Sequence, residues 1–244
     1  MRLAIIADIH GNSWALAAVL EDINKREVSG IYDLGDSLNG SLDPAGTFKL
    51  LESNQIESIS GNGDRFIREN NIGNQTYDYV IAEIRSINAM AWLQGLPKTR
   101  TVENMLLCHG TPFNDSEYLI EKVETGYIAI KSADILENQL AGIAEPVIFC
   151  GHSHRPYLVN TNTKKIVNPG SVGLPAYDDD TPLYHKMETY SPMARYCIVN
   201  RKNGKFVIEH IAVSYDFEAA AIKAEQNNRN DWAGWLRTGY AQSK

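Results

Sequence analysis

Carboxylate, imidazole and amide side chains follow almost every short apolar run of this sequence. One residue separates Asp8 from His10, and one separates His152 from His154; this spacing sends both side chains of a pair to the same side of an extended segment. In chain order, the polar residues after the five apolar runs are Asp8, His10, Asp36, Asn62, Asp64, His109, His152 and His154. Imidazole together with carboxylate and amide oxygen suits Mn, Fe, Zn or Ni better than Ca. The pattern predicts a metal site.

The predicted chemistry is phosphate-ester hydrolysis at two divalent metal ions. Asp8 and Asp36 carry too little negative charge to neutralise two such ions, so residual positive charge would attract a phosphate. Two ions about 3.5–4 Å apart can clamp the attacking and leaving oxygens of an in-line displacement. Each short motif is weak evidence alone, and a lone histidine is more often satisfied by hydrogen bonds. Four of the six histidines fall in this set, which favours one shared site.

The elements that must position these residues are strands alternating with helices. Carboxyl ends of parallel strands share one edge of a sheet, where ligands bind. Strands are predicted at 3–7, 30–34, 56–60, 105–108 and 146–150, and helices at 14–23 (with Ser13 as its N-cap), 43–51, 77–93 and within 120–140. From residue 157 onward we predict a β-meander with a hairpin at Asn203-Gly204, a long loop over 177–192, a helix over 217–226 and a polar tail. One α/β domain over residues 1–244, with two packed sheets between helices, accounts for this order.

Composition limits the cellular setting and the partners. The chain has 244 residues, is 43% hydrophobic and carries a formal net charge of −7. It has no basic stripe, so long nucleic acids are not expected as partners. No apolar run reaches the roughly 18 residues of a membrane span, and the first one is too short for a signal peptide. We therefore expect a cytoplasmic protein with a small phosphoester substrate; the sequence does not predict its oligomeric state.

The order DxH, GD, GNxD, H and GHxH resembles the calcineurin-like metallophosphoesterases, from Asp8 to about Val199. The segments HGTP at 109–112 and NPGSVG at 168–173 are similar to those of small bacterial, phosphodiesterase-like members. The resemblance implies a four-layer α/β/β/α sandwich with two mixed sheets flanked by helices. It also implies that Asp8, His10, Asp36 and His154 hold one metal ion, and that Asp36, Asn62, His109 and His152 hold the other. A hydroxide bridging the two ions would attack phosphorus.

The resemblance also assigns residues that act on the substrate. Asn62 would help to place the phosphate, and Asp64 would orient its neighbours. Many family members have GNH[DE], in which the histidine assists the leaving group, but this chain has Gly63 at that position. We hypothesise that the 177–192 loop covers the site, so that His185 or a nearby tyrosine fills the place. Arg65 is a further candidate for phosphate contact, with a surface ion pair as the alternative.

Three functions remain open from the sequence. A hydrolase of phosphodiesters or small phosphoesters is favoured because Gly63 weakens the case for an efficient monoesterase. The alternative enzyme is a phosphomonoesterase, including a protein serine/threonine phosphatase. A non-catalytic interaction scaffold on the same fold, as in a retromer subunit, is expected to lose metal ligands, and all seven are present here.

Overall fold

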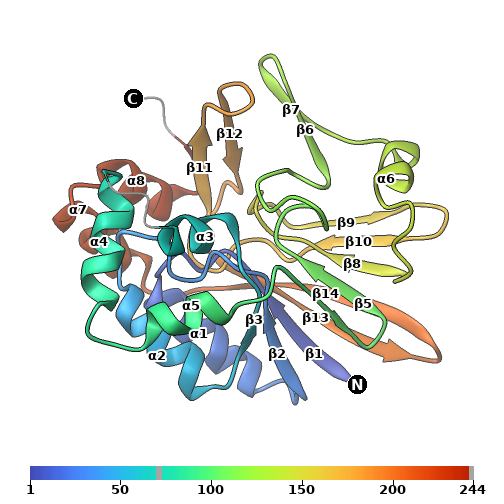
Figure 1. The fold of residues 1–244 in the computed structure, drawn as a ribbon, viewed down its shortest axis with the longest axis horizontal. Helices are drawn as coiled ribbons and strands as arrows, with labels where there is room; N and C mark the ends of the chain where they lie inside the picture. The colour runs from blue at the N-terminus through green and yellow to red at the C-terminus, as the bar shows by residue number, and fades with distance from the viewer. Residues whose placement is uncertain (70–72, 242–244) are drawn as a thin grey trace.

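The computed structural model describes residues 1–69 and 73–241. Over these residues the chain forms two five-stranded mixed sheets, two separate hairpins and eight helices (Figure 1). The two large sheets pack against each other, and helices cover their outer faces. The predicted α/β class and its four-layer α/β/β/α sandwich are therefore confirmed.

The first large sheet contains the N-terminal strand at its centre. Its strands, in spatial order, are β14 (Lys205–Val213), β13 (Ala194–Lys202), β1 (Arg2–Ile6), β2 (Gly30–Asp33) and β3 (Glu57–Ser58). Strands β1, β2 and β3 are parallel, and β13 pairs antiparallel with both β1 and β14. The helices that follow the parallel strands are α1 (Ser13–Asn24), α2 (Pro44–Ser53) and α3 (Asn62–Arg68). The carboxyl ends of β1, β2 and β3 thus open onto one edge.

The second large sheet is built from the middle of the chain. In spatial order its strands are β4 (Thr99–Val102), β5 (Met105–Cys108), β8 (Val147–Phe149), β10 (Lys165–Asn168) and β9 (Tyr157–Asn160). Strands β5, β8 and β10 are parallel. Helix α6 (Ala133–Gln139) packs on this sheet through the buried side chain of Leu136.

Alternation along β1 explains why the molecule has layers. Leu3 and Ile5 belong to the apolar cluster between the two sheets, together with Phe149 of β8. Ala4 and Ile6 point the other way, into the cluster beneath the helices. A strand sends successive side chains to opposite faces, so a continuous apolar run becomes a strand that is buried on both sides.

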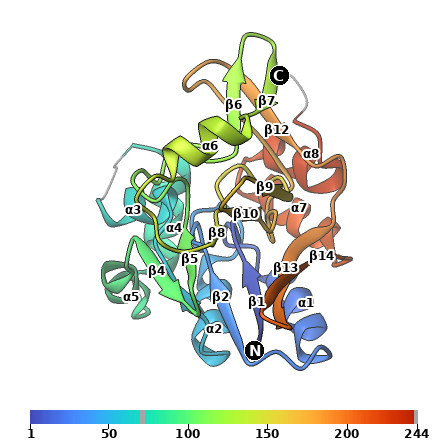
Figure 2. The same cartoon turned by 90° about the vertical axis from the view of Figure 1, so that its right-hand side faces the viewer.

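Two hairpins project beyond the ends of the large sheets. They are β6 (Glu121–Glu124) with β7 (Tyr127–Ile130), and β11 (Ala176–Asp179) with β12 (His185–Glu188). Figure 2 shows both at the same end of the molecule. The sequence predicted one or two helices within 120–140, and α6 confirms one of them, but residues 121–130 form the β6–β7 hairpin instead. The loop predicted over 177–192 was wrong where β11 and β12 form. Gly126, with φ of +84°, makes the turn between β6 and β7, and β-branched residues on either side favour strands.

Other local predictions need smaller corrections. The single helix predicted over 77–93 is two helices, α4 (Gln75–Ile84) and α5 (Ala89–Gly95), separated by the weak helix formers Ser86 and Asn88. The predicted meander is divided among three sheets. Asn12 rather than Ser13 caps α1, because its side-chain oxygen accepts the Ala15 N–H at 3.1 Å.

The C-terminal part contains a helix that the sequence did not predict. Helix α7 (Phe217–Gln226) matches its predicted range, but the expected polar tail forms α8 (Asn230–Thr238). Trp232, Trp235 and Leu236 have helical spacing, and all three are buried. Because polar residues surround these three side chains, the short apolar face is hard to recognise in the sequence. No helix in the described part of the chain is long and apolar enough to cross a membrane.

Candidate metal centre

The predicted ligands meet where the carboxyl ends of the two parallel strand sets converge. Asp8 and His10 follow β1, Asp36 follows β2, and Asn62 begins the helix after β3. His109 follows β5 in the second sheet, and the segment after β8 carries His152 and His154. The contact between the sheets therefore brings ligands from both into one centre. The structure thus brings these side chains together, and their role as metal ligands stays a prediction.

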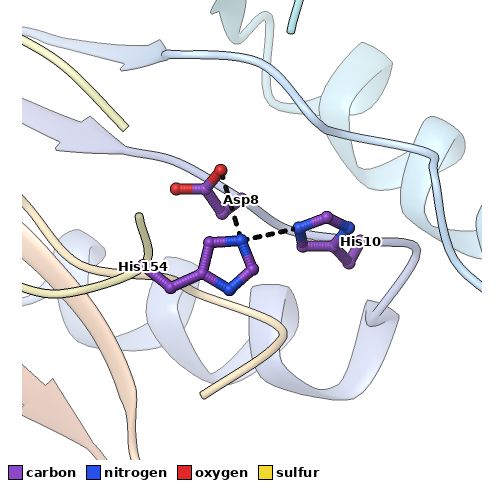
Figure 3. Close-up of side chains that lie close together, drawn as sticks. All are labelled: Asp8, His10 and His154. Atoms are coloured by element: carbon purple, nitrogen blue, oxygen red, sulfur yellow. Dashed lines mark hydrogen bonds and ion pairs between the residues drawn. The ribbon is translucent and has the colours of Figure 1, made fainter. Parts of the chain in front are cut away.

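Among the described residues, two groups of three side chains could each hold a metal ion, and within each group the ligand atoms lie within 4.8 Å of one another. The first group is Asp8, His10 and His154, whose side chains point toward one another (Figure 3). The second is Asp8, Asp36 and His109. Oδ1 of Asp36 lies 3.6 Å from Nε2 of His109, and its Oδ2 lies 3.9 Å from Nε2 of His10. Asp36 therefore faces both halves of the centre, while Asp8 also belongs to both groups.

Backbone carbonyls fix how three of the imidazoles present their nitrogens. Nδ1 of His10 donates to the carbonyl of Asn39 at 2.7 Å, and Nδ1 of His154 donates to that of Leu174 at 2.7 Å. Nδ1 of His109 lies 2.9 Å from a third carbonyl, that of Leu34. A carbonyl only accepts, so in the neutral imidazole the lone pair is on Nε2. Nε2 of His10 and Nε2 of His154 thus turn a lone pair toward the centre. Nε2 of His109 lies 3.0 Å from Oδ1 of Asn62, and although burial opposes its protonation, Asp36 and Asp8 raise the pKa of His109.

Burial shapes the charges of the centre. Burial lowers the pKa of His10 and lowers that of His154 well below its ordinary value, and it lowers the pKa of His152 to about 3. These imidazoles are therefore neutral near pH 7, as metal ligation requires. Burial opposes ionisation of Asp36, but the facing histidines, His109 first, outweigh it and hold its pKa below the usual range.

The backbone at the centre is strained. Five of the predicted ligands have positive φ, a region that non-glycine residues rarely occupy; they are Asp8 (54°), His10 (52°), Asp36 (55°), His152 (67°) and His154 (60°). Such conformations cost about 1–3 kcal/mol each and persist where surrounding structure imposes them, commonly at functional sites.

The carboxylate of Asp64 connects the loop that carries Asp36 to the backbone at Gly61, just before Asn62. Its carboxylate accepts backbone N–H groups from Asp36 at 2.7 Å, Gly61 at 3.0 Å and Ser37 at 3.1 Å. It is fully buried and does not line the cavity beside the centre. Its position fits the predicted orienting role, which remains a proposal.

A cavity of about 330 Å³ opens over the centre. The predicted ligands on its wall are His10, Asp36, Asn62, His152 and His154. Tyr177 also lines it, so a tyrosine of the 177–192 segment, the alternative to His185, lies beside the centre. The sequence did not identify the rest of the wall, which is Asn39, Leu174, Asp178, Asp179, Arg229, Asp231, Trp232 and Trp235. Much of this wall comes from β11 and α8, the elements that were predicted as loop and tail. The helical spacing of the two tryptophans in α8 was the sequence feature that could have revealed this part of the wall.

Arg65 and His185 lie outside this cavity, contrary to their predicted substrate contacts. The guanidinium of Arg65 pairs with both oxygens of Asp115, with Nε 2.8 Å from Oδ2, so the ion-pair alternative describes it. His185 is buried and lines a second cavity, between the two projecting hairpins. It reaches the centre only indirectly: its Nε2 lies 2.8 Å from the hydroxyl of Tyr118, whose ring stacks on His152.

Comparison with known proteins agrees with this architecture. Residues 1–192 match the model of the calcineurin-like phosphoesterase superfamily domain. The chain belongs to this family of metallophosphoesterases, and the predicted resemblance is confirmed.

Several relatives align with nearly the whole chain. An uncharacterised protein of Methanocaldococcus jannaschii is 28% identical over 254 residues, covering 95% of both chains. A metallophosphoesterase from Sphaerobacter thermophilus superimposes with a TM-score of 0.77 at 21% identity, covering 98% of this chain and 100% of that one. A hypothetical protein from Pyrococcus horikoshii has the same TM-score at 18% identity, with 99% of each chain covered. At such identities the two structures establish the fold alone.

Proposed function

We propose that this protein is a dinuclear metal-dependent hydrolase of small phosphate esters that prefers phosphodiesters. Membership of the calcineurin-like phosphoesterase family supports hydrolysis of phosphoesters, and the cluster of buried aspartates and histidines supports the binding of metal ions. The observation that supports the metal centre most directly is the 3.0 Å separation between Nε2 of His10 and Nε2 of His154. Both nitrogens carry lone pairs and burial disfavours a proton between them, so a cation is the partner that this geometry requires.

The donor set fits two borderline divalent ions such as Mn, Fe, Zn or Ni. We assign Asp8, His10, Asp36 and His154 to one ion, and Asp36, Asn62, His109 and His152 to the other. When bound, the ions would polarise the phosphoryl group and lower the pKa of a water molecule. The chain itself orients the ligands: the Gly63 N–H donates to Oδ1 of Asp36 at 2.7 Å, and the His152 N–H donates to the Asp8 carboxylate at 3.2 Å.

The charge of the cavity wall supports diesters over monoesters. Asp178, Asp179 and Asp231 line it beyond the ligands, and Arg229 is the basic residue among the lining residues. Nε and Nη2 of Arg229 both donate to the carboxylate of Asp231, so the charges of these two residues neutralise each other. The remaining acidic charge repels a dianionic monoester more than a monoanionic diester. A small phosphodiester is the substrate class we propose.

Metal analysis combined with a two-substrate assay tests the proposal. We expect about two divalent ions per chain, and faster Mn²⁺-dependent hydrolysis of bis(4-nitrophenyl) phosphate than of 4-nitrophenyl phosphate. Asp36→Asn should lose at least one ion and reduce hydrolysis by about a hundredfold or more. The matched control Asp216→Asn changes the same charge at the N-cap of α7, where asparagine also caps, and should retain both properties. A metal-free, inactive wild-type protein after Mn²⁺ loading would refute the proposal.

A further inference from the structure

Asn39 and Gly63 share one space beside the centre. A Cβ atom built on Gly63 would lie 2.2 Å from Nδ2 of Asn39 and 2.6 Å from its Cβ, distances that real side chains do not tolerate. Asn39 comes from the segment after Asp36, whereas Gly63 lies in the first turn of α3. Position 63 is therefore a glycine because the carboxamide of Asn39 fills the place where its side chain would be.

The Asn39 side chain has no protein partner in the described part of the chain. Its Oδ1 is buried without a hydrogen bond, and no hydrogen bond of the described residues uses its Nδ2. Only its backbone carbonyl is engaged, by Nδ1 of His10. Buried polar groups almost always have partners, so a free carboxamide is an exception that calls for an explanation.

The position of the carboxamide supplies that explanation. Asn39 lines the cavity together with Asp36, Asn62 and His10, so it stands beside the space where a substrate would lie over the ligands. A carboxamide can present two N–H donors or a carbonyl acceptor, and it is neutral in either orientation. It can therefore stabilise developing negative charge on oxygen but cannot give up a proton.

We propose that Asn39 is a catalytic residue whose Nδ2–H group donates to the leaving oxygen of the bound phosphoester. This inference rests on the function proposed above. As water oxygen bonds to phosphorus and loses a proton to solvent, the bond from phosphorus to the leaving oxygen breaks. That oxygen keeps the electron pair, is held by the amide hydrogen bond and takes a proton from water afterwards. The enzyme would thus select esters whose leaving group is stable as an anion.

Asn39→Ala tests the contact on two diesters that differ in leaving-group acidity. For Mn²⁺-loaded protein and bis(4-nitrophenyl) phosphate we expect kcat/KM to fall about 100–1000-fold, as for loss of one hydrogen-bond donor to a developing oxyanion. With diphenyl phosphate, whose leaving group is less acidic, the fall should be larger. The melting temperature should stay within about 2 °C of wild type, because the side chain makes no hydrogen bond. Asn160→Ala, at an exposed asparagine of β9, is the matched control and should retain the wild-type rate.

A pair of histidine variants tests the shared space without relying on activity. Gly63→His alone should lower the melting temperature by about 3–10 °C, because the new side chain overpacks against Asn39. The double variant Asn39→Gly/Gly63→His, which also removes the Cβ of Asn39 that lies 2.6 Å away, should recover most of that loss. It should also hydrolyse diphenyl phosphate faster than Asn39→Ala does, since an imidazole can protonate the leaving oxygen.

The outcomes separate this inference from the proposed function. A wild-type protein that hydrolyses neither diester would overturn both. If the wild type is active and Asn39→Ala retains kcat/KM within twofold, the inference on Asn39 alone fails. Should Asn39→Ala melt below the assay temperature, Asn39→Asp takes its place: it keeps the size and puts a carboxylate against the anion. Loss of activity in this folded variant supports the contact, and unchanged activity overturns it. A double variant no more stable than Gly63→His would refute the shared space.

Discussion

At the scale of single residues, buried acids make the stability of this protein depend on pH. Glu121 is almost fully buried, and burial raises the pKa of its carboxyl to about 7, although Ser153 donates to Oε1 at 2.6 Å. In the unfolded chain this group titrates near its ordinary value, about 4.3. Between these two values the unfolded chain has released the proton that the folded protein still holds. Raising the pH through this window therefore favours unfolding.

Glu121→Gln should remove part of this pH dependence. In the wild type, ionisation of the buried carboxyl costs roughly 1–3 kcal/mol of unfolding free energy between pH 5 and 8. The glutamine variant keeps an oxygen for Ser153 and carries no charge, so its stability should fall less over the same range. Urea denaturation at pH 5, 6, 7 and 8 in chelator measures this. Equal slopes for the two proteins would show that Glu121 does not titrate abnormally.

Asp64 gives a second prediction at this scale. Its oxygens accept N–H groups from the Asp36 and Gly61 backbone, so the amide of Asp64→Asn would set an N–H donor against another donor. We expect a loss of about 2–3 kcal/mol in unfolding free energy. Metal affinity should also fall about 10–100-fold, the usual effect of a lost partner behind a ligand. Thermal melting and Mn²⁺ titration measure the two effects. Unchanged Mn²⁺ affinity would mean that the Asp36 loop keeps its position without the carboxylate.

At the scale of elements, Asn12 connects the N-terminus of helix α1 to segments that come much later in the sequence. It caps α1 through Oδ1, while its Nδ2 donates to the Gly173 carbonyl at 2.9 Å and to the Tyr215 hydroxyl at 3.2 Å. Asn12 follows the Asp8 and His10 loop directly, so these bonds hold the first ligands in place. A spacing rule could suggest a helix cap near residue 13, but it could not reveal the contacts to residues 173 and 215.

A comparison of two N-caps measures this extra role. Asn12→Ala should lower the unfolding free energy by about 2–4 kcal/mol, because it removes the cap and leaves buried partners unsatisfied. Asp216→Ala, which removes the α7 cap to Ala219, should cost only about 1 kcal/mol. Chemical denaturation of both variants gives the difference. Similar losses would indicate that the long-range bonds of Asn12 add nothing.

At the scale of the whole molecule, the cavity wall depends on elements that follow residue 175. Strand β11 and helix α8 contribute Asp178, Asp179 and Asp231 to a wall that faces ligands from both sheets. Trp232 fixes α8 against the centre, with its ring perpendicular to that of His10 at 5.9 Å between centroids. Packing of the C-terminal part on the ligand loops thus decides the charge that an incoming substrate meets.

Neutralising this wall should change substrate preference. A unit charge about 8 Å from the phosphate contributes about 0.5 kcal/mol in water. The double variant Asp178→Asn/Asp179→Asn should therefore raise kcat/KM for a dianionic monoester relative to a monoanionic diester by about fivefold. Asp134→Asn, at an exposed site on α6, should leave the ratio unchanged. Steady-state kinetics at low salt measures the ratio, and a ratio that stays constant in the double variant would assign the selectivity to other residues.

The sequence by itself determined the two sheets and the candidate ligand side chains that meet between them. Buried parallel strands are continuous apolar runs, and Asp8, Asp36, His109 and His152 stand directly after such runs, so local pattern carries the information. It did not determine the wall of the cavity. Asn39 is unremarkable in sequence and Trp232 lies in a polar stretch. His185 is paired in register with Asp179 of the cavity wall, but its ring bonds to the Tyr118 hydroxyl and does not line the cavity. Which side chains face a substrate depends on contacts between segments far apart in the chain, and only tertiary packing decides those.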